Sequence, residues 1–146
     1  MSVRISESTL NVFNPTTGED ISSISMTTIP ELHSILHNAK DAAVSYNFSS
    51  FYHRQKLIKN FQKGIVRHMD DFIETICSET GKKEVEGLME VFISLEHMQQ
   101  SYRNIYKALG KRSRRAGILK TRKVWVEYEP IGVAGIISPW NYPLIL

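Results

Sequence analysis

The chain has 146 residues, of which 42% are hydrophobic and 23% charged, and its formal net charge is +3. This ordinary globular composition excludes a disordered or low-complexity chain, and no apolar run is long enough to span a bilayer. A single cysteine excludes an intrachain disulfide, and the amino terminus lacks the apolar core of a secretory signal, so we expect a cytoplasmic protein without membrane contacts.

A β-hairpin is predicted near the amino terminus. The runs Leu10–Phe13 and Ile21–Ile24 flank a turn-rich stretch at residues 14–18, which is the signal of two strands joined by a turn. A helix should follow, because Thr28 and Glu31 have the spacing of a capping box, with a proline in the first turn. The apolar face of this helix would carry Leu32, Ile35, Leu36, Ala39, Ala43 and Tyr46.

Two further apolar patterns with helical spacing lie between residues 57 and 109. The first is weakened in its middle by Gly64 and should end at Gly81, and the second should end at Gly110. The first pattern consists of Leu57, Phe61, Ile65, Met69, Phe72, Ile73 and Ile76. The second consists of Val85, Leu88, Phe92, Leu95, Tyr102, Ile105 and Leu109. We interpret all three stripes as core contacts between helices.

The carboxyl-terminal segment carries two strand patterns and a stiff loop. Residues 122–129 alternate apolar and polar side chains, and Val133–Ile137 is an uninterrupted apolar run that predicts a strand buried on both faces, as in a parallel sheet. Pro139 and Pro143 restrict the loop between them and so hold Asn141 in place. Such an amide can donate to an oxyanion or line a cofactor crevice, and it can equally cap a following helix.

Three ordered motifs resemble the aldehyde dehydrogenase superfamily. The stretch Glu129–Gly135 leads into Ser138–Pro143 in the same way as the family's E-P-x-G-V-x-G segment leads into P-W-N-[FY]-P. Residues 14–19 are similar to the family's N-P-x-T-G-E, and residues 79–82 to its E-T-G-K, with Glu90 in the acidic position that follows. The Pro-Trp-Asn segment is highly specific, and the order of all three matches supports the resemblance over nearly the whole chain.

The resemblance implies an α/β fold, namely the amino-terminal part of an aldehyde dehydrogenase-like cofactor-binding domain, truncated at residue 146. Residues 1–121 would form the hairpin and the long helices of this domain. Residues 122–131 would form a strand of the arm used for oligomerisation, so a homo-oligomer is expected when the protein is full length. Residues 132–146 would form the first strand of the parallel sheet and the Pro-Trp-Asn loop.

The resemblance also implies an enzyme that oxidises an aldehyde to a carboxylic acid with NAD or NADP, through a thiohemiacetal and a thioester. Asn141 would be catalytic, donating its side-chain amide to the oxyanion, and Tyr142 would face the substrate tunnel. The residues that would line the cofactor crevice, largely through their backbone, are Ile137, Ser138, Pro139, Trp140 and Asn141. The family's nucleophilic cysteine, its general-base glutamate and its phosphate-binding turn would lie beyond residue 146, so the 146-residue chain alone is expected to be inactive.

The chain's own cysteine and histidines are expected to be structural. Cys77 lies in a helical apolar pattern between Glu74 and Glu79, which would raise the pKa of a thiol rather than lower it. His33 and His37 are four residues apart, a spacing found at metal sites, but no third ligand of matching context accompanies them. We therefore expect no metal.

A basic run offers a second function. Eight lysines and arginines lie between Lys107 and Lys123, and no acid occurs from Ile105 to Val126. The alternative to an enzyme is a non-catalytic helical module that binds an anionic partner through this run. A nucleic-acid site should also interleave aromatic side chains, and the run has none in its basic core. We therefore interpret it as a solvated surface loop, without a nucleic-acid partner.

Overall fold

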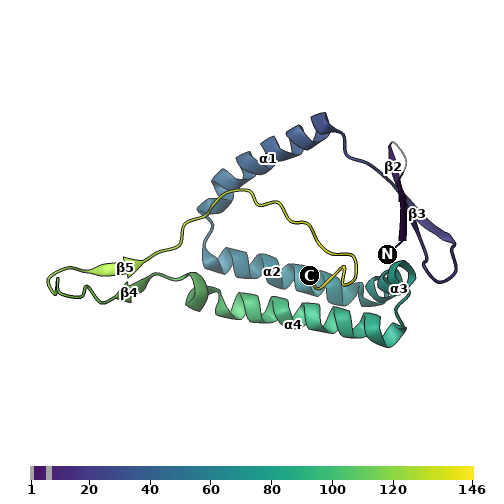
Figure 1. Ribbon diagram of the computed structural model, residues 1–146. Helices are drawn as coiled ribbons and strands as arrows, with labels where there is room; N and C mark the ends of the chain where they lie inside the picture. Colours follow the sequence, from purple (N-terminus) through teal and green to yellow (C-terminus); the bar gives the residue numbers. More distant parts are fainter. Residues whose placement is uncertain (1, 6–7) are drawn as a thin grey trace.

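Over the residues that the structure describes, the fold combines four helices with five short strands, arranged as Figure 1 shows. The computed structural model describes residues 2–5 and 8–146, with side chains from residue 8 onward. The elements in chain order are β1 (Ser2–Ile5), β2 (Thr9–Phe13), β3 (Asp20–Ser25), α1 (Ile29–Asn47), α2 (Phe51–Arg67), α3 (Met69–Thr80), α4 (Glu84–Leu109), β4 (Arg112–Arg114) and β5 (Val124–Val126).

Helices α2, α3 and α4 form the packed layer of the molecule, and the other elements are arranged around it. The β1–β2–β3 sheet lies at the α3 end, and the β4–β5 hairpin projects from the opposite end, after α4 (Figure 1). Helix α1 stands apart from this layer, and it is not among the closely packed element pairs of the described chain. The segment after β5 runs back past α1 and ends against the helical layer.

The predicted amino-terminal hairpin is confirmed. Strands β2 and β3 pair antiparallel, with Leu10 opposite Ile24, and Val12 is fully buried. Asn14 forms the turn, because its side-chain oxygen accepts hydrogen bonds from the backbone N–H groups of Thr16 at 2.8 Å and of Thr17 at 3.2 Å. Strand β1, which the sequence did not predict, adds to the free edge of β2.

The predicted start of α1 is confirmed, but the predicted burial of its apolar face is wrong. The Glu31 N–H donates to Thr28 Oγ1 at 3.4 Å, and Glu31 Oε2 accepts from the Thr28 N–H at 2.8 Å, which completes the capping box. The latter hydrogen bond holds the pKa of the Glu31 carboxyl below its usual range. Leu32 and Ile35 are 42% and 54% exposed, since α1 is not among the closely packed element pairs of the described chain.

The apolar pattern that runs from Leu57 to Ile76 is divided between two helices. Helix α2 ends at Arg67, and α3 begins at Met69, so the break falls at His68, whereas Gly64, which was expected to weaken the pattern, lies inside α2. The backbone N–H of His68 donates to the carbonyls of Gly64 and Ile65, which closes the last turn of α2. Gly81 ends α3 as predicted, because its φ of 73° places it in the left-handed region that favours glycine.

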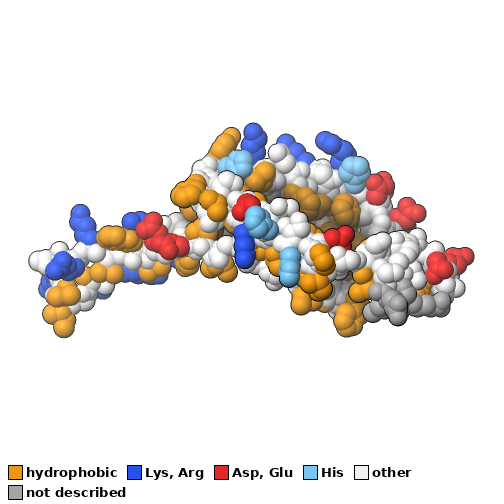
Figure 2. All heavy atoms as spheres, turned by 90° about the horizontal axis from the view of Figure 1, so that it is seen from above, with side chains coloured by type: hydrophobic (Ala, Val, Ile, Leu, Met, Phe, Trp, Pro, Cys, Tyr) orange, Lys and Arg blue, Asp and Glu red, His pale blue; other side chains and the backbone are white. Residues whose placement is uncertain are grey.

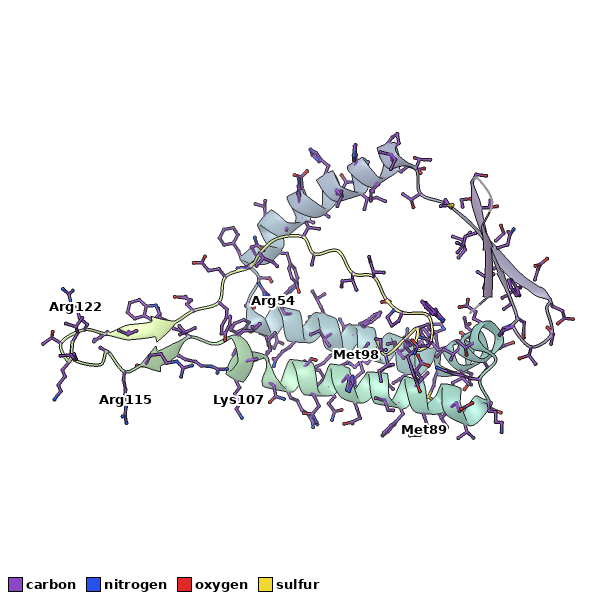
Figure 3. The ribbon with its side chains drawn as sticks, in the orientation of Figure 1. Arg54, Met89, Met98, Lys107, Arg115 and Arg122 are labelled. Atoms are coloured by element: carbon purple, nitrogen blue, oxygen red, sulfur yellow. The ribbon has the colours of Figure 1, made fainter. Side chains whose placement is uncertain are left out.

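The core lies between α2, α3 and α4. Ile65, Ile76 and Val91 are 1%, 4% and 0% exposed, one from each helix, and partly buried apolar side chains surround them. Figure 3 shows Met98, one of these surrounding residues, between α2 and α4. Gly87 lets α4 approach α3 closely, because a Cβ there would lie 3.0 Å from the Cys77 Sγ atom. The predicted inter-helix packing is therefore confirmed for this layer.

The face that α4 buries differs from the predicted stripe. The predicted Val85, Leu88 and Phe92 are 70%, 43% and 57% exposed. The buried residues of α4 are Gly87, Glu90, Val91, Ser94 and Ile105. The predicted stripe is confirmed in part, because its Ile105 is buried and its Leu95 packs against the core. The buried residues that an apolar pattern does not detect are Gly87, Glu90 and Ser94.

The basic run forms one strand and the connection of a hairpin: its residues 112–114 are β4, and its residues 115–123 form the predicted surface loop that leads to β5. Strand β4, which was not predicted, pairs antiparallel with β5, and β5 is shorter than the predicted strand at residues 122–129. Lys111 Nζ lies 3.2 Å from Glu127 Oε2 and 4.2 Å from the centroid of the Trp125 ring. In the described part of the chain, no helix is both long and apolar enough to cross a membrane.

The predicted strand at Val133–Ile137 is wrong. Residues 131–139 belong to no helix or strand, and the side chains of Ile136 and Ile137 are 85% and 100% exposed. A strand of a parallel sheet needs neighbouring strands for its hydrogen bonds and covering layers for its side chains. The described residues supply neither beside this segment.

Candidate functional site

The segment singled out by the Pro-Trp-Asn motif ends in a compact loop, residues 138–146, against the helical layer (Figure 1). Ser138 Oγ donates to the main-chain oxygen of Leu146 at 3.2 Å, and the Leu146 N–H donates to the Tyr142 carbonyl at 3.3 Å. The Leu144 side chain packs against the Ile65–Ile76–Val91 core. The loop is therefore closed on itself and anchored through its carboxyl-terminal half.

A buried ion pair lies beneath this loop. The Glu90 side chain is fully buried on α4, and its Oε2 atom lies 2.6 Å from the Lys82 Nζ atom. Its other oxygen, Oε1, accepts a hydrogen bond from the Leu144 backbone N–H at 2.9 Å. Lys82 Nζ also lies 3.9 Å from the centroid of the Tyr142 ring, within range of a cation–π interaction. The ion pair thus contacts the loop at two of its residues.

The predicted site residues share this loop but stay open to solvent. Ile137, Ser138, Pro139, Trp140 and Asn141 are all exposed, and Tyr142 is 47% exposed over Lys82. Within the described residues, the Asn141 amide has no hydrogen-bond partner, so it caps no backbone group there. The amide is held by the loop on both sides and remains available to a ligand.

Sequence reasoning missed the contact between Lys82, Glu90 and the loop. Lys82 and Glu90 were identified only as part of a family motif, and the signal that could have linked them to the loop was that motif itself. Their partner Leu144 is 54 residues away from Glu90. A pairing at that separation has no periodic signature in a single sequence.

Cys77 lies on α3 in a groove of about 330 Å³ lined by Asp70, Ile73, Glu74 and Glu84. Burial raises the pKa of the Cys77 thiol, and the negative charge of Glu84 raises it further. The predicted direction of the shift is therefore confirmed, although the acids that act on the thiol lie on α4 rather than beside it in the sequence. A thiol kept in its neutral form is a poor nucleophile.

The Cys77 thiol should therefore alkylate slowly with iodoacetamide at neutral pH. Its thiolate forms only above the pH at which an ordinary cysteine ionises, so the pH–rate profile should be displaced to higher pH. Glu84→Gln should move the profile back toward lower pH, because it removes one of the charges that oppose ionisation. A profile at or below that of free cysteine would contradict this assignment.

The histidines and cavities give no competing site near the loop. His37 Nδ1 lies 3.1 Å from Asp41 Oδ2, with both side chains largely exposed. Among the described residues, no three potential ligands gather in a way that could hold a metal ion. An apolar groove of about 490 Å³ lies between α2 and α3, lined in part by Phe61, Gly64 and Phe72, and includes none of the predicted site residues.

The basic hairpin lies far from the loop. Figure 3 shows Arg115 and Arg122 near its tip, beyond Lys107 at the end of α4, and Figure 2 shows basic side chains spread over the projection. Arg112 folds back to donate hydrogen bonds to the carbonyls of Lys107 and Ala108. Part of the positive charge is therefore used to fix the hairpin to the helix.

The chain is similar to known sequences over nearly its whole length. The sequence model of the aldehyde dehydrogenase family matches residues 3–146. Mitochondrial succinate-semialdehyde dehydrogenase of Mus musculus is 29% identical over 138 residues, which cover 92% of this chain and 25% of that protein. Malonate-semialdehyde dehydrogenase 2 of Oceanobacillus iheyensis is 28% identical over 140 residues, which cover 96% of this chain and 28% of that protein.

Solved structures show the same fold. Methylmalonate-semialdehyde dehydrogenase from Oceanimonas doudoroffii matches with a TM-score of 0.85 and 22% identity, over 99% of this chain and 29% of that one. NADP-dependent glyceraldehyde-3-phosphate dehydrogenase from Bacillus halodurans, complexed with NADP, matches with a TM-score of 0.84 and 22% identity, over 94% of this chain and 30% of that one. The predicted fold class, an α/β fold that matches the amino-terminal part of aldehyde dehydrogenase structures, is confirmed. The chain spans about a quarter of the length of the curated relatives it matches, and it belongs to the aldehyde dehydrogenase family.

Proposed function

We propose that these residues are part of an NAD(P)-dependent dehydrogenase that oxidises an aldehyde to a carboxylic acid. Family membership supports the reaction class, and the relatives named above are dehydrogenases of semialdehydes and of an aldehyde phosphate. The observation that carries the proposal is the loop itself. It presents the Asn141 amide to solvent without a hydrogen-bond partner among the described residues, while Leu144 and Tyr142 fix the following residues to the helices.

In this reaction, a thiolate adds to the aldehyde carbon, and the carbonyl π electrons move to the oxygen to form an oxyanion. Bound NAD(P)+ supplies the hydride acceptor. Loss of the hydride leaves a thioester, which water hydrolyses to the carboxylic acid while the thiol is released. Asn141 donates its amide N–H to the oxygen as negative charge develops there. Because burial and Glu84 raise the pKa of Cys77, we assign the nucleophile to a cysteine outside these residues.

The backbone before the loop suits a cofactor contact. Within the described chain, residues 131–141 make no backbone–backbone hydrogen bonds, so their C=O groups, and the N–H groups of all of them except Pro139, are free for a ligand. In the proposal, NAD or NADP lies along Ile137–Asn141 and contacts it largely through the backbone. Tyr142 faces the substrate, and residues 122–131 contribute to an oligomerisation arm, with β5 as its strand.

An assay of aldehyde-dependent NAD(P)H formation tests the proposal. The complete enzyme that contains these residues should reduce NAD+ or NADP+ with at least one aldehyde and release an equal amount of carboxylic acid. The 146-residue chain alone should give no NAD(P)H, since it lacks a reactive thiol. Activity of the isolated chain would overturn the assignment of the nucleophile, and a folded complete protein that is inert toward every aldehyde tested would overturn the function.

The projecting basic hairpin is the observation that favours a second candidate, an anion-binding module. Against it, Lys111 and Arg112 are engaged in contacts within the protein, and Lys111 lies over one face of the Trp125 ring. A salt-sensitive gel shift with nucleic acid would support this candidate. Cofactor protection of the complete enzyme from proteolysis would support the dehydrogenase.

A further inference from the structure

Glu90 is a buried carboxylate whose two oxygens have different partners. Oε2 pairs with Lys82 at 2.6 Å, and Oε1 accepts the Leu144 N–H at 2.9 Å. A buried charge is stable only when it is paired and hydrogen-bonded, and here both requirements are met. Lys82 lies just before α4 in the sequence, whereas Leu144 belongs to the Pro-Trp-Asn loop, 54 residues after Glu90.

Lys82 extends the same arrangement to a second loop residue. Its ammonium lies between the Glu90 carboxylate and the face of the Tyr142 ring, 3.9 Å from the ring centroid. Tyr142 directly follows Asn141, and Leu144 lies two residues further on. The two contacts therefore fix the backbone immediately after Asn141, while Ser138 closes the loop from the other side through Leu146.

Fold stability alone does not account for this pair. Apolar residues of similar volume can replace a buried ion pair with little loss or even a gain of stability. An apolar pair would also pack against the Ile65–Ile76–Val91 core, which already holds the Leu144 side chain. An apolar pair could not, however, accept a hydrogen bond from the Leu144 N–H. The hydrogen bond from this N–H to Glu90 is directional, so it determines where the loop backbone lies.

We propose that Glu90, supported by Lys82, is a positioning residue that holds the loop of residues 138–146 and thereby sets the position of the Asn141 amide. The effect on the loop stands by itself, whereas the effect on the reaction rests on the proposed dehydrogenase function. Glu90 contacts no reacting atom and acts through the Leu144 backbone.

A matched pair of variants isolates the acceptor. Both carry Lys82→Met, which removes the ammonium, and they differ at the glutamate, as Glu90→Gln or Glu90→Met. Neither double variant buries an unpaired charge, and the two new side chains have nearly the same shape. Only Glu90→Gln retains a carbonyl oxygen that can accept the Leu144 N–H. Glu96→Ala, on the same helix and without a described loop contact, serves as the control for removing an acid from α4.

Trp140 reports on the loop without any assay of activity. The 146 residues contain two tryptophans, so Trp125→Phe leaves Trp140, which is 68% exposed in the loop, as the sole tryptophan of this chain, and selective tryptophan excitation reports on it. The fluorescence anisotropy of Trp140 should be higher, and its acrylamide quenching slower, with Glu90→Gln than with Glu90→Met. The Glu96→Ala control should match the parent chain. Equal anisotropy and quenching in the two folded double variants would overturn the proposal.

The rate in the complete enzyme tests the catalytic consequence. The kcat of the Glu90→Met double variant should fall below that of its Glu90→Gln counterpart by up to about 100-fold, the size of effect that a small misplacement of a reacting group produces. Equal kcat values despite a change at Trp140 would overturn the catalytic part alone. If the parent enzyme oxidises no aldehyde, the proposed function fails, while the Trp140 comparison still decides the role of Glu90.

Discussion

Replacing Asn141 with alanine should lower kcat of the complete enzyme by roughly 10² to 10³, equivalent to about 2.7–4 kcal/mol of transition-state stabilisation. The amide acts on charge that develops after the aldehyde binds, so the loss should appear in kcat rather than in KM for the cofactor. Folding should be unaffected, because the amide has no hydrogen-bond partner among the described residues. Steady-state kinetics with a saturating aldehyde, together with a thermal melt, provide the measurement.

Asn141→Asp tests whether the effect on kcat depends on the charge that faces the oxyanion. It keeps the size of the side chain but places a negative charge toward the oxyanion, so it should be more harmful than alanine. A variant that keeps its kcat while the protein unfolds, or while cofactor binding collapses, would instead identify Asn141 as a structural residue of the loop.

Replacing Ile65 with alanine should lower the free energy of unfolding by about 2–5 kcal/mol. Ile65 is 1% exposed at the point where α2 meets α3 and α4, and Phe72, Leu95 and other apolar side chains enclose the cluster around it. The substitution removes buried methyl and methylene groups and leaves a cavity that the surrounding helices can fill only in part. Urea denaturation followed by circular dichroism should show a lower midpoint with an unchanged slope.

Val66→Ala is the matched control for this loss. Val66 follows Ile65 on the same helix but is 54% exposed, so its truncation should change stability by no more than about 0.5 kcal/mol. Similar midpoints for the two variants would show that the α2–α3–α4 cluster is not the core of the fold.

Elements encoded by neighbouring residues could be predicted from the sequence. The Thr28–Glu31 capping box joins residues three apart, and Gly81 ends α3 through its own φ. The hairpin turn at Asn14 is likewise stabilised by contacts within a few residues. These interactions join residues within a single turn of the chain, so they form the same local structure wherever the segment packs.

Predictions that depended on packing partners were less successful. The apolar face of α1 and the run Val133–Ile137 were expected to be buried, but both are largely exposed, since neither is packed closely against the α2–α3–α4 layer in the described chain. The opposite error occurred on α4, where Glu90 is buried although charged residues are rarely found inside. Its burial depends on Lys82 and on a backbone group far away in the sequence.

The site could be predicted only as far as the motif reached. The Pro-Trp-Asn motif identified Asn141 and its loop, and the structure holds that loop in a compact form. The motif could not identify what supports the loop, since that support comes from Glu90 on α4 and from Lys82, two residues after the end of α3. Such a support is visible only when the loop and the helix are placed side by side.

The most direct measurement is a double-mutant cycle between Glu90 and Asn141 in the complete enzyme. The Lys82→Met/Glu90→Gln and Lys82→Met/Glu90→Met variants are each combined with Asn141→Ala, and kcat is measured for all four proteins. If α4 acts on the reaction by positioning Asn141, the difference between the Glu90 variants should disappear once Asn141 is alanine. An undiminished difference in the Asn141→Ala background would contradict this role of the loop.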